Sequence, residues 1–332
     1  MSGVAPAHPA GASVQAVVDA GGEPAARLLV RLEQRLAELA SGHGELLARH
    51  AGSTIAAGGK RLRPLLVFLS AAVPPPESEQ LLTAAVAVEL VHSATLVHDD
   101  VIDGSALRRG RPTVAAAAGR LTATSTGDLL FSRAFAELAR SCCSASVRVL
   151  SRASSELAAG ELMQRDDAWT AVAVERYLER CRLKTAVLFR AACELGAIAG
   201  GGAGAAAAEL AGFGEQIGLA FQLLDDVLDI AGPPERTGKP QGADLLDGTV
   251  TLPVILARAA DRELAALDLR SIDSPPAAAE LCARIAATGA LDVARGRALE
   301  LVAGAKRSLP PMGDAQRAAL ELVADGVVER YA

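Results

Sequence analysis

Residues 96–113 read LVHDDVIDGSALRRGRPT, which gathers three aspartates and three arginines in a chain otherwise rich in alanine and leucine. On a helix, positions i and i+4 share a face, so Asp99 and Asp103 point the same way, with Asp100 beside them. A second stretch, FQLLDDVLDIAG at residues 221–232, repeats the acidic pattern. We call the two sets the first aspartate motif (Asp99, Asp100, Asp103) and the second aspartate motif (Asp225, Asp226, Asp229).

Three carboxylates this close repel one another unless a cation neutralises them. Oxygen ligands without a His or Cys cluster suit Mg²⁺, which binds a couple of carboxylates and leaves its other positions to water and phosphate oxygens. The alternative is a solvated acidic helix end, but apolar residues that should bury the helix precede both motifs. We therefore predict that all six aspartates are Mg²⁺ ligands. His92 and His98 are not spaced as a metal pair, and neither is expected to bind a metal.

The rest of the chain predicts an all-α protein. Of its 332 residues 51% are hydrophobic and only 3% aromatic. From Ala25 onward apolar residues recur at helical spacing, as in LLVRLEQRLAELA at residues 28–40. Glycine- and proline-rich breaks separate the helical segments, at residues 57–64, 73–78, 104–113, 200–205, 232–244 and 273–276. We predict a flexible tail over residues 1–24 and a single helical domain over residues 25–332.

Several classes of protein are disfavoured. A net charge of −6 gives no support for a nucleic-acid surface. The five cysteines form no CxxC pair, as expected of reduced thiols in a cytoplasmic protein. The most apolar run, residues 81–97, is interrupted by Glu89 and His92 and is too short for a bilayer core of roughly 30 Å. We expect no transmembrane segment, and the N-terminus has no signal-peptide pattern.

Basic residues near the acidic motifs can bind an anion. The loop GGKRLRP at residues 58–64 places Lys60, Arg61 and Arg63 behind two glycines, where main-chain N–H groups and fixed cations can reach a phosphate. Further cations follow the first motif or stand alone, at Arg108, Arg109, Lys184 and Lys239. Each lone cation would by default be a solvated surface charge. Their number, beside two acidic motifs, is enough for two diphosphates.

Seven motifs resemble, in the same order, those of the trans-isoprenyl diphosphate synthases, the polyprenyl synthetase family. They are GGKRLRP, HDDVID with RRGRPT, GDLLFSRAF, GELMQ, KTA, FQLLDDVLD and GKPQGADLLDGTVTLP. The resemblance runs from about Leu28 to the C-terminus. It implies a bundle of long helices around a deep central cavity, a homodimer, and Mg²⁺ held by both aspartate motifs.

The resemblance also implies the substrates and their sites. Isopentenyl diphosphate would condense with an allylic diphosphate, whose departing pyrophosphate leaves an allylic cation. The positions matching the isopentenyl diphosphate site are Lys60, Arg63, His92 and Arg109. Those matching the allylic diphosphate site are Arg108, Lys184, Thr185, Gln222 and Lys239, and Lys184 is also expected to assist catalysis.

Product length is expected to depend on the helix that leads to Asp99. In short-chain relatives the position five residues before that aspartate often carries an aromatic ring, whereas this sequence has Ala94 followed by Thr95. The growing chain would pass this level and stop deeper, against Phe131 or Phe135. We therefore expect a long-chain polyprenyl diphosphate, suited to a quinone side chain.

Other functions stay open at this point. A short-chain farnesyl or geranylgeranyl diphosphate synthase would share the motifs. A non-catalytic partner subunit usually loses an aspartate motif, and here both are intact. A terpene cyclase needs no second diphosphate site, and a di-iron bundle would need histidines that this sequence lacks.

Overall fold

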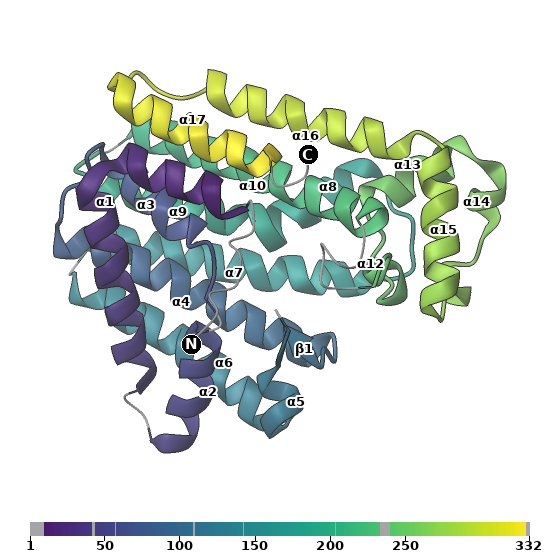
Figure 1. The fold of residues 1–332 in the computed structure, drawn as a ribbon, viewed down its shortest axis with the longest axis horizontal. Helices are drawn as coiled ribbons and strands as arrows, with labels where there is room; N and C mark the ends of the chain where they lie inside the picture. Colours follow the sequence, from purple (N-terminus) through teal and green to yellow (C-terminus); the bar gives the residue numbers. More distant parts are fainter. Residues whose placement is uncertain are drawn as a thin grey trace, which may run out of the picture. The chain divides into compact units, whose positions relative to one another are not determined.

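The computed structural model describes residues 10–41, 44–56, 58–108, 110–141, 143–202, 204–232 and 240–329. These residues are almost entirely helical (Figure 1), which confirms the all-α prediction. Within the described ranges the strands are β1 (Leu107–Arg108) and β2 (Arg111–Pro112), an antiparallel hairpin that pairs Arg108 with Arg111. The hairpin falls in the break predicted at residues 104–113, where polar and apolar residues do not alternate over a run long enough to predict strands.

The chain forms two compact units. The described parts of the first unit lie in residues 10–152, 188–214 and 308–329, and those of the second in residues 153–187 and 215–307. The first aspartate motif belongs to the first unit and the second motif to the second unit. The prediction of a single domain stays a prediction.

The N-terminal helix starts earlier than the sequence indicates. We expected no helix before Ala25, but α1 spans Ala10–Ser41 with a kink at Gly22, whose φ of 72° is not helical. Gly22 and Pro24 suggest an end to the helix, yet the chain resumes the helix at once. Packing explains this, because Val17 is buried and a side chain at Gly21 would contact Leu69. Residues 1–9 of the predicted tail lie outside the described residues.

The first unit is organised around α4 (Glu79–Ile102), which packs against α1, α2, α3, α5 and α6. Its N-cap Ser78 accepts a hydrogen bond from the backbone N–H of Leu81, and residues 81–91 are all buried. The other helices are α2 (Glu45–Ala56), α3 (Leu62–Ala71), α5 (Val114–Ala118), α6 (Arg120–Arg140), α9 (Val187–Ala199) and α17 (Asp314–Glu329), together with the first parts of α7 (Ser144–Asp166) and α10 (Ala205–Ala231). Although α17 ends the chain, it packs beside α1 and α3 (Figure 1).

Among the described helices α4 alone is long and apolar enough to cross a membrane. In its most apolar window 78% of the helix is buried inside the protein, as in the core helix of a globular protein.

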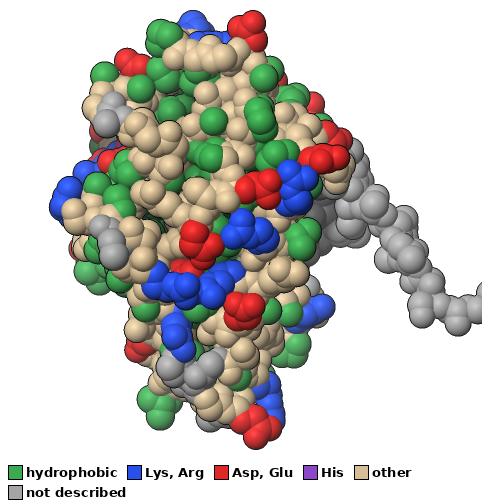
Figure 2. All heavy atoms as spheres, turned by 90° about the vertical axis from the view of Figure 1, so that its left-hand side faces the viewer, with side chains coloured by type: hydrophobic (Ala, Val, Ile, Leu, Met, Phe, Trp, Pro, Cys, Tyr) green, Lys and Arg blue, Asp and Glu red, His purple; other side chains and the backbone are tan. Residues whose placement is uncertain are grey.

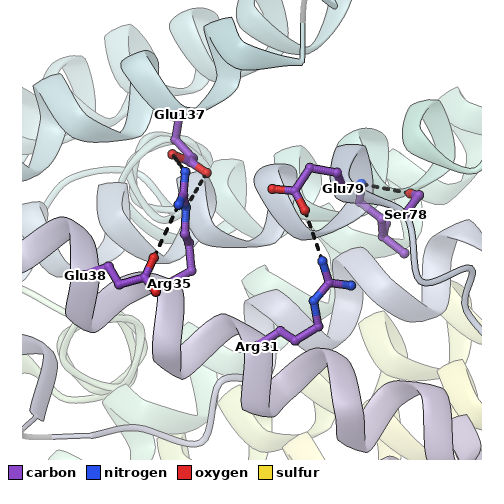
Figure 3. Close-up of polar contacts among 7 residues, drawn as sticks. Arg31, Arg35, Glu38, Ser78, Glu79 and Glu137 are labelled. Carbon is purple, nitrogen blue, oxygen red and sulfur yellow. Dashed lines mark hydrogen bonds and ion pairs between the residues drawn. The ribbon is translucent and has the colours of Figure 1, made fainter.

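α1 has one apolar face and one charged face. Leu28, Leu32 and Leu36 are fully buried. Arginines on the other face pair with acidic residues of α1, α4 and α6, as Figure 3 shows. A further arginine, Arg27, pairs with Glu77 in the loop before α4. Figure 2, viewed from the side where α1 lies in Figure 1, shows acidic and basic side chains interspersed.

The second unit contains shorter helices. They are α8 (Val174–Cys181), the π-helical turn η1 (Arg182–Ala186), α12 (Ala243–Leu246), α13 (Leu252–Ala260), α14 (Arg262–Ala266), the 3₁₀ turn η2 (Leu269–Ser271), α15 (Pro275–Ala287) and α16 (Ala290–Arg307), with the rest of α7 and α10. Proline occupies the first turn of α13 and of α15, where its missing N–H costs no hydrogen bond. α13 packs against α8, α14, α15 and α16.

Candidate active site

The first aspartate motif lies at the C-terminal end of α4. Asp99 is half-buried, Asp100 is buried, and Asp103, the C-cap residue, is exposed. Arg108 in β1 returns to the helix end and donates from Nε to Oδ1 of Asp100 over 2.8 Å. A cavity of about 70 Å³ lies beside this ion pair and is also lined by Thr54, Leu96 and Arg111, among others.

The second aspartate motif lies in the last turns of α10. Asp225 is exposed and Asp229 half-buried, but Asp226 is only 2% exposed. The Tyr177 hydroxyl donates to Oδ2 of Asp226 over 2.5 Å, and Gln222 Nε2 donates to Oδ1 over 2.7 Å. The Thr185 hydroxyl in turn donates to Oε1 of Gln222 over 2.7 Å, which fixes the orientation of the amide.

Burial, and after it the negative charge of Asp244, raise the pKa of Asp226 to about 8. Asp244 also lies close to the motif, because its backbone N–H donates to Oδ2 of Asp229 over 3.3 Å. Asp244 belongs to the GKPQGAD motif, but the sequence alone does not predict its position beside the second aspartate motif.

The two motifs share one arrangement. In each, the middle aspartate is buried and bonded to protein side chains, while the outer two, at i and i+4, are at least partly exposed. Throughout the described residues, no three His, Cys, Asp or Glu side chains gather as a ready metal site. That all six aspartates bind Mg²⁺ stays a prediction. An accessible pair of carboxylates per motif still fits Mg²⁺, because Mg²⁺ takes one or two carboxylates and completes its shell with water and phosphate.

The GGKRLRP loop leads into α3 and separates its three cations. Lys60 is exposed, Arg61 is buried, and Arg63 is half-buried. Arg63 Nη1 lies 3.3 Å from His92 Nε2, and its guanidinium lies 4.4 Å from the centroid of the Phe189 ring. Burial lowers the pKa of Arg63 to about 10, opposed by the charge of Glu89, so the side chain remains a cation at neutral pH. Its buried Nε has no hydrogen-bond partner, as expected of a group that binds an anion.

Lys184 and Thr185 lie in η1, and π-helical turns inside helices are frequent at functional sites. Lys184 Nζ forms an ion pair with Glu161 Oε2 at 2.6 Å. Glu161 comes from the GELMQ motif, and the preceding Gly160 explains the close approach of α7. A Cβ atom at Gly160 would lie 2.6 Å from the backbone nitrogen of Lys184.

The structure places some of the predicted substrate-binding residues in contact with one another. Arg63 lies beside His92, and Thr185 lies beside Gln222. The substrate roles of these residues stay predictions. Arg109 and Lys239 lie outside the described residues. Tyr177 and Glu89 were missed, because neither belongs to a motif and only their burial beside charged groups reveals them. His98 is half-buried, its ring stacked on Phe131 with centroids 5.7 Å apart.

The residues expected to control product length are all described. Ala94 is fully buried in α4, and the hydroxyl of Thr95 donates to the carbonyl of His92 over 2.8 Å. Phe131 and Phe135 are half-buried one turn apart on α6, which packs along α4. Their role in product length stays a prediction.

Comparison with known proteins defines the class. The Polyprenyl synthetase family matches residues 45–286. A heptaprenyl diphosphate synthase component 2 from Geobacillus stearothermophilus is 41% identical over 240 residues, covering 72% of this chain and 75% of that protein. A geranylgeranyl diphosphate synthase from Methanosarcina mazei is 36% identical over 284 residues, covering 82% and 86%.

Among solved structures, a polyprenyl synthase from Caulobacter crescentus, in complex with calcium and isoprenyl diphosphate, superposes with a TM-score of 0.88. It is 35% identical, with 95% of this chain and 98% of that chain covered. The fold is thus the all-α fold of the isoprenyl synthases. The chain belongs to the polyprenyl synthetase family.

Proposed function

We propose that this protein is a Mg²⁺-dependent trans-polyprenyl diphosphate synthase that condenses isopentenyl diphosphate with an allylic diphosphate. The observation that carries the proposal is the shared arrangement of the two aspartate motifs. Each offers an accessible carboxylate pair beside a buried, hydrogen-bonded aspartate. The related Caulobacter structure holds calcium and isoprenyl diphosphate, which supports a divalent cation and a diphosphate as ligands of this family.

The outer aspartates Asp99, Asp103, Asp225 and Asp229 would hold Mg²⁺, and the buried Asp100 and Asp226 would keep them in place. When bound, Mg²⁺ neutralises negative charge on the allylic diphosphate. Arg108, Lys184, Thr185 and Gln222, with Lys239, would position that diphosphate and stabilise the charge that develops on the leaving pyrophosphate. Lys60, Arg63 and His92, with Arg109, would hold isopentenyl diphosphate, whose double bond attacks the allylic cation. The released pyrophosphate would accept the proton lost in forming the new double bond.

We propose further that the product is a long-chain polyprenyl diphosphate that serves as a quinone side chain. The small Ala94 before the first motif supports this, since it offers no aromatic floor. The similarity to a heptaprenyl diphosphate synthase component supports it as well. The similarity to a geranylgeranyl diphosphate synthase favours the short-chain alternative.

One assay tests the proposal. The purified chain is incubated with isopentenyl diphosphate, farnesyl diphosphate and Mg²⁺, and the dephosphorylated products are separated by chromatography. We expect Mg²⁺-dependent consumption of both substrates and products longer than geranylgeranyl. Products that end at geranylgeranyl would establish the short-chain alternative, and no condensation with farnesyl diphosphate or any shorter allylic diphosphate would contradict prenyl transfer by the chain alone.

A second candidate is a subunit that acts only with a partner chain. The name of the Geobacillus relative, component 2, favours it. It predicts that the isolated chain binds isopentenyl diphosphate, as a rise in melting temperature, but turns it over only when the partner is added. The homodimer and the cytoplasmic location remain proposals, which light scattering and cell fractionation would test.

A further inference from the structure

Arg61 is the one cation of the GGKRLRP loop to which the proposed function gives no role. Its side chain is only 8% exposed. Nε and Nη2 donate to the two carboxylate oxygens of Glu33 over 2.6 and 3.0 Å. Nη1 donates to Oε1 of Glu89 over 2.6 Å, and Nη2 also donates to the carbonyl of Ile55 over 3.1 Å. The guanidinium therefore ties the loop to α1, α2 and α4.

The backbone of Arg61 is also unusual. It has φ 48° and ψ 33°, in the left-handed region that residues with a Cβ atom rarely enter. Such a conformation persists when the surroundings hold it, and it recurs at ligand-binding sites. Here the four hydrogen bonds of the side chain hold it, at the residue from which α3 begins. The backbone conformation of Arg61 therefore sets the relative orientation of Lys60, before it in the loop, and Arg63, after it in α3.

Glu89 links Arg61 to the candidate substrate site. Glu89 and His92 are three residues apart on α4 and share a face. Glu89 holds Arg61, and His92 lies 3.3 Å from Arg63. The carboxylate of Glu89 is 5% exposed and also attracts Arg63 electrostatically. Burial raises the pKa of Glu89, and Arg61 and Arg63 oppose that shift, so without Arg61 the adjacent cation left to compensate the Glu89 carboxylate is Arg63.

We propose that Arg61 is a positioning residue for isopentenyl diphosphate. By neutralising Glu89 and fixing the loop, Arg61 leaves the guanidinium of Arg63 available to the diphosphate. Loss of Arg61 draws Arg63 onto Glu89 and away from the substrate. This inference rests on the proposed function, which places isopentenyl diphosphate at Lys60, Arg63 and His92.

The test compares Arg61→Gln, the double variant Arg61→Gln/Glu89→Gln, and a matched control. The control is Arg35→Gln, because Arg35 also holds a buried glutamate of the first unit, Glu137, but is not part of the loop. KM is measured separately for isopentenyl diphosphate and farnesyl diphosphate, together with the rise in melting temperature caused by isopentenyl diphosphate alone.

We expect Arg61→Gln to raise KM for isopentenyl diphosphate about tenfold or more, as for a lost hydrogen bond to a charged group. KM for farnesyl diphosphate should change less than about twofold. The double variant should recover most of the loss, because Arg63 no longer has a charged Glu89 to pair with. Arg35→Gln should lower the melting temperature and leave both KM values unchanged.

Three results would overturn the proposal. The first is an unchanged KM for isopentenyl diphosphate in Arg61→Gln, and the second is an equal change in KM for both substrates. The third is a double variant whose KM for isopentenyl diphosphate is as high as that of Arg61→Gln. If Arg61→Gln does not fold, Arg61→Lys and the double variant carry the test. In both variants KM for isopentenyl diphosphate is expected within about threefold of the wild-type value, and a tenfold rise in KM in either one overturns the proposal. Absence of turnover in the wild type would count against the proposed function instead, while the ligand-induced melting shift would still report on Arg61.

Discussion

The most informative residues are the two middle aspartates, Asp100 and Asp226. A carboxylate removed from water is stable only when it is paired or hydrogen-bonded, and both of these are. Asp100 accepts from Arg108, and Asp226 accepts from Tyr177 and Gln222. Both oxygens of Asp226 and Oδ1 of Asp100 are engaged by protein side chains, which suits these aspartates to orienting their neighbours. The motif DDxxD therefore contains two kinds of aspartate.

The difference between exposed and buried aspartates predicts a large loss of turnover for some substitutions and a smaller loss for others. Asp99→Ala or Asp225→Ala should lower turnover by several orders of magnitude, because each removes a proposed metal ligand, while the helix survives since alanine favours helix. Tyr177→Phe removes only the hydroxyl that holds Asp226, and should lower turnover by about 10–100-fold and raise the Mg²⁺ concentration required. Steady-state kinetics over a Mg²⁺ series measures both. Near-normal turnover in Asp225→Ala would show that the second motif has no part in the reaction.

At the scale of elements, α1 stabilises the first unit through pairs of unequal strength. Arg35 forms two hydrogen bonds, of 2.9 and 3.1 Å, to Glu137 of α6, which is 2% exposed. Arg27 pairs with Glu77 at 2.9 Å, but both are open to solvent. Exposed pairs contribute little, whereas removing one partner of a buried pair leaves an uncompensated charge.

Arg35→Ala should therefore lower the free energy of unfolding by about 3 kcal/mol. Arg27→Ala should change it little, because both partners of that pair remain in water. Urea denaturation of both variants gives the comparison, with Arg27→Ala as the matched control on the same helix. Equal losses would mean that the burial of Glu137 does not decide the strength of the pair.

The contact between α7 and η1 gives a second prediction at this scale. A Cβ atom at Gly160 would lie 2.6 Å from the nitrogen of Lys184 and 2.8 Å from the carbonyl carbon of Leu183, and backbone atoms cannot yield cheaply. Gly160→Ala should displace the turn that carries Lys184 and Thr185, raising KM for the allylic substrate about tenfold or more by disturbing charged contacts. Gly212→Ala in α10 is the control, because nothing lies within 4 Å of its added Cβ. A Gly160→Ala enzyme with unchanged kinetics would mean that the position of η1 is not critical.

For the whole molecule, the decisive property is the length of product it can hold. Ala94 precedes Asp99 by five residues, about 7.5 Å along the helix axis. Ala94→Phe would place a ring at this level and should shorten the product to farnesyl or geranylgeranyl diphosphate without slowing the first condensation. Chromatography of the products of the wild type, Ala94→Val and Ala94→Phe should give progressively shorter chains. A melting scan checks that the buried substitution leaves the fold intact. If the wild-type protein itself stops at those lengths, Ala94 is not the gate.

Local patterns in the sequence determined the helical class, the family, the two acidic motifs and some helix breaks, such as those at residues 57–64, 73–78 and 200–205. Such signals depend on neighbours along the chain: periodicity, caps, Gly and Pro, and residue spacing. They failed for the segment before Gly22, which was expected to be a flexible tail but forms a helix, because Val17 is buried in the core.

Only the tertiary structure decided which aspartates are buried and which cations are committed to the fold. Tyr177 reaches Asp226 from α8, and Glu33 and Glu89 reach Arg61 from α1 and α4. These partners lie far apart in the sequence and carry no spacing signal. In the sequence Arg61 and Arg63 look alike. Arg61 is buried beside Glu33 and Glu89 and bonded to both, so it stabilises the fold. The buried Nε of Arg63 has no hydrogen-bond partner. The physical reason for the difference is that the free-energy cost of burying a charge depends on the groups that surround it.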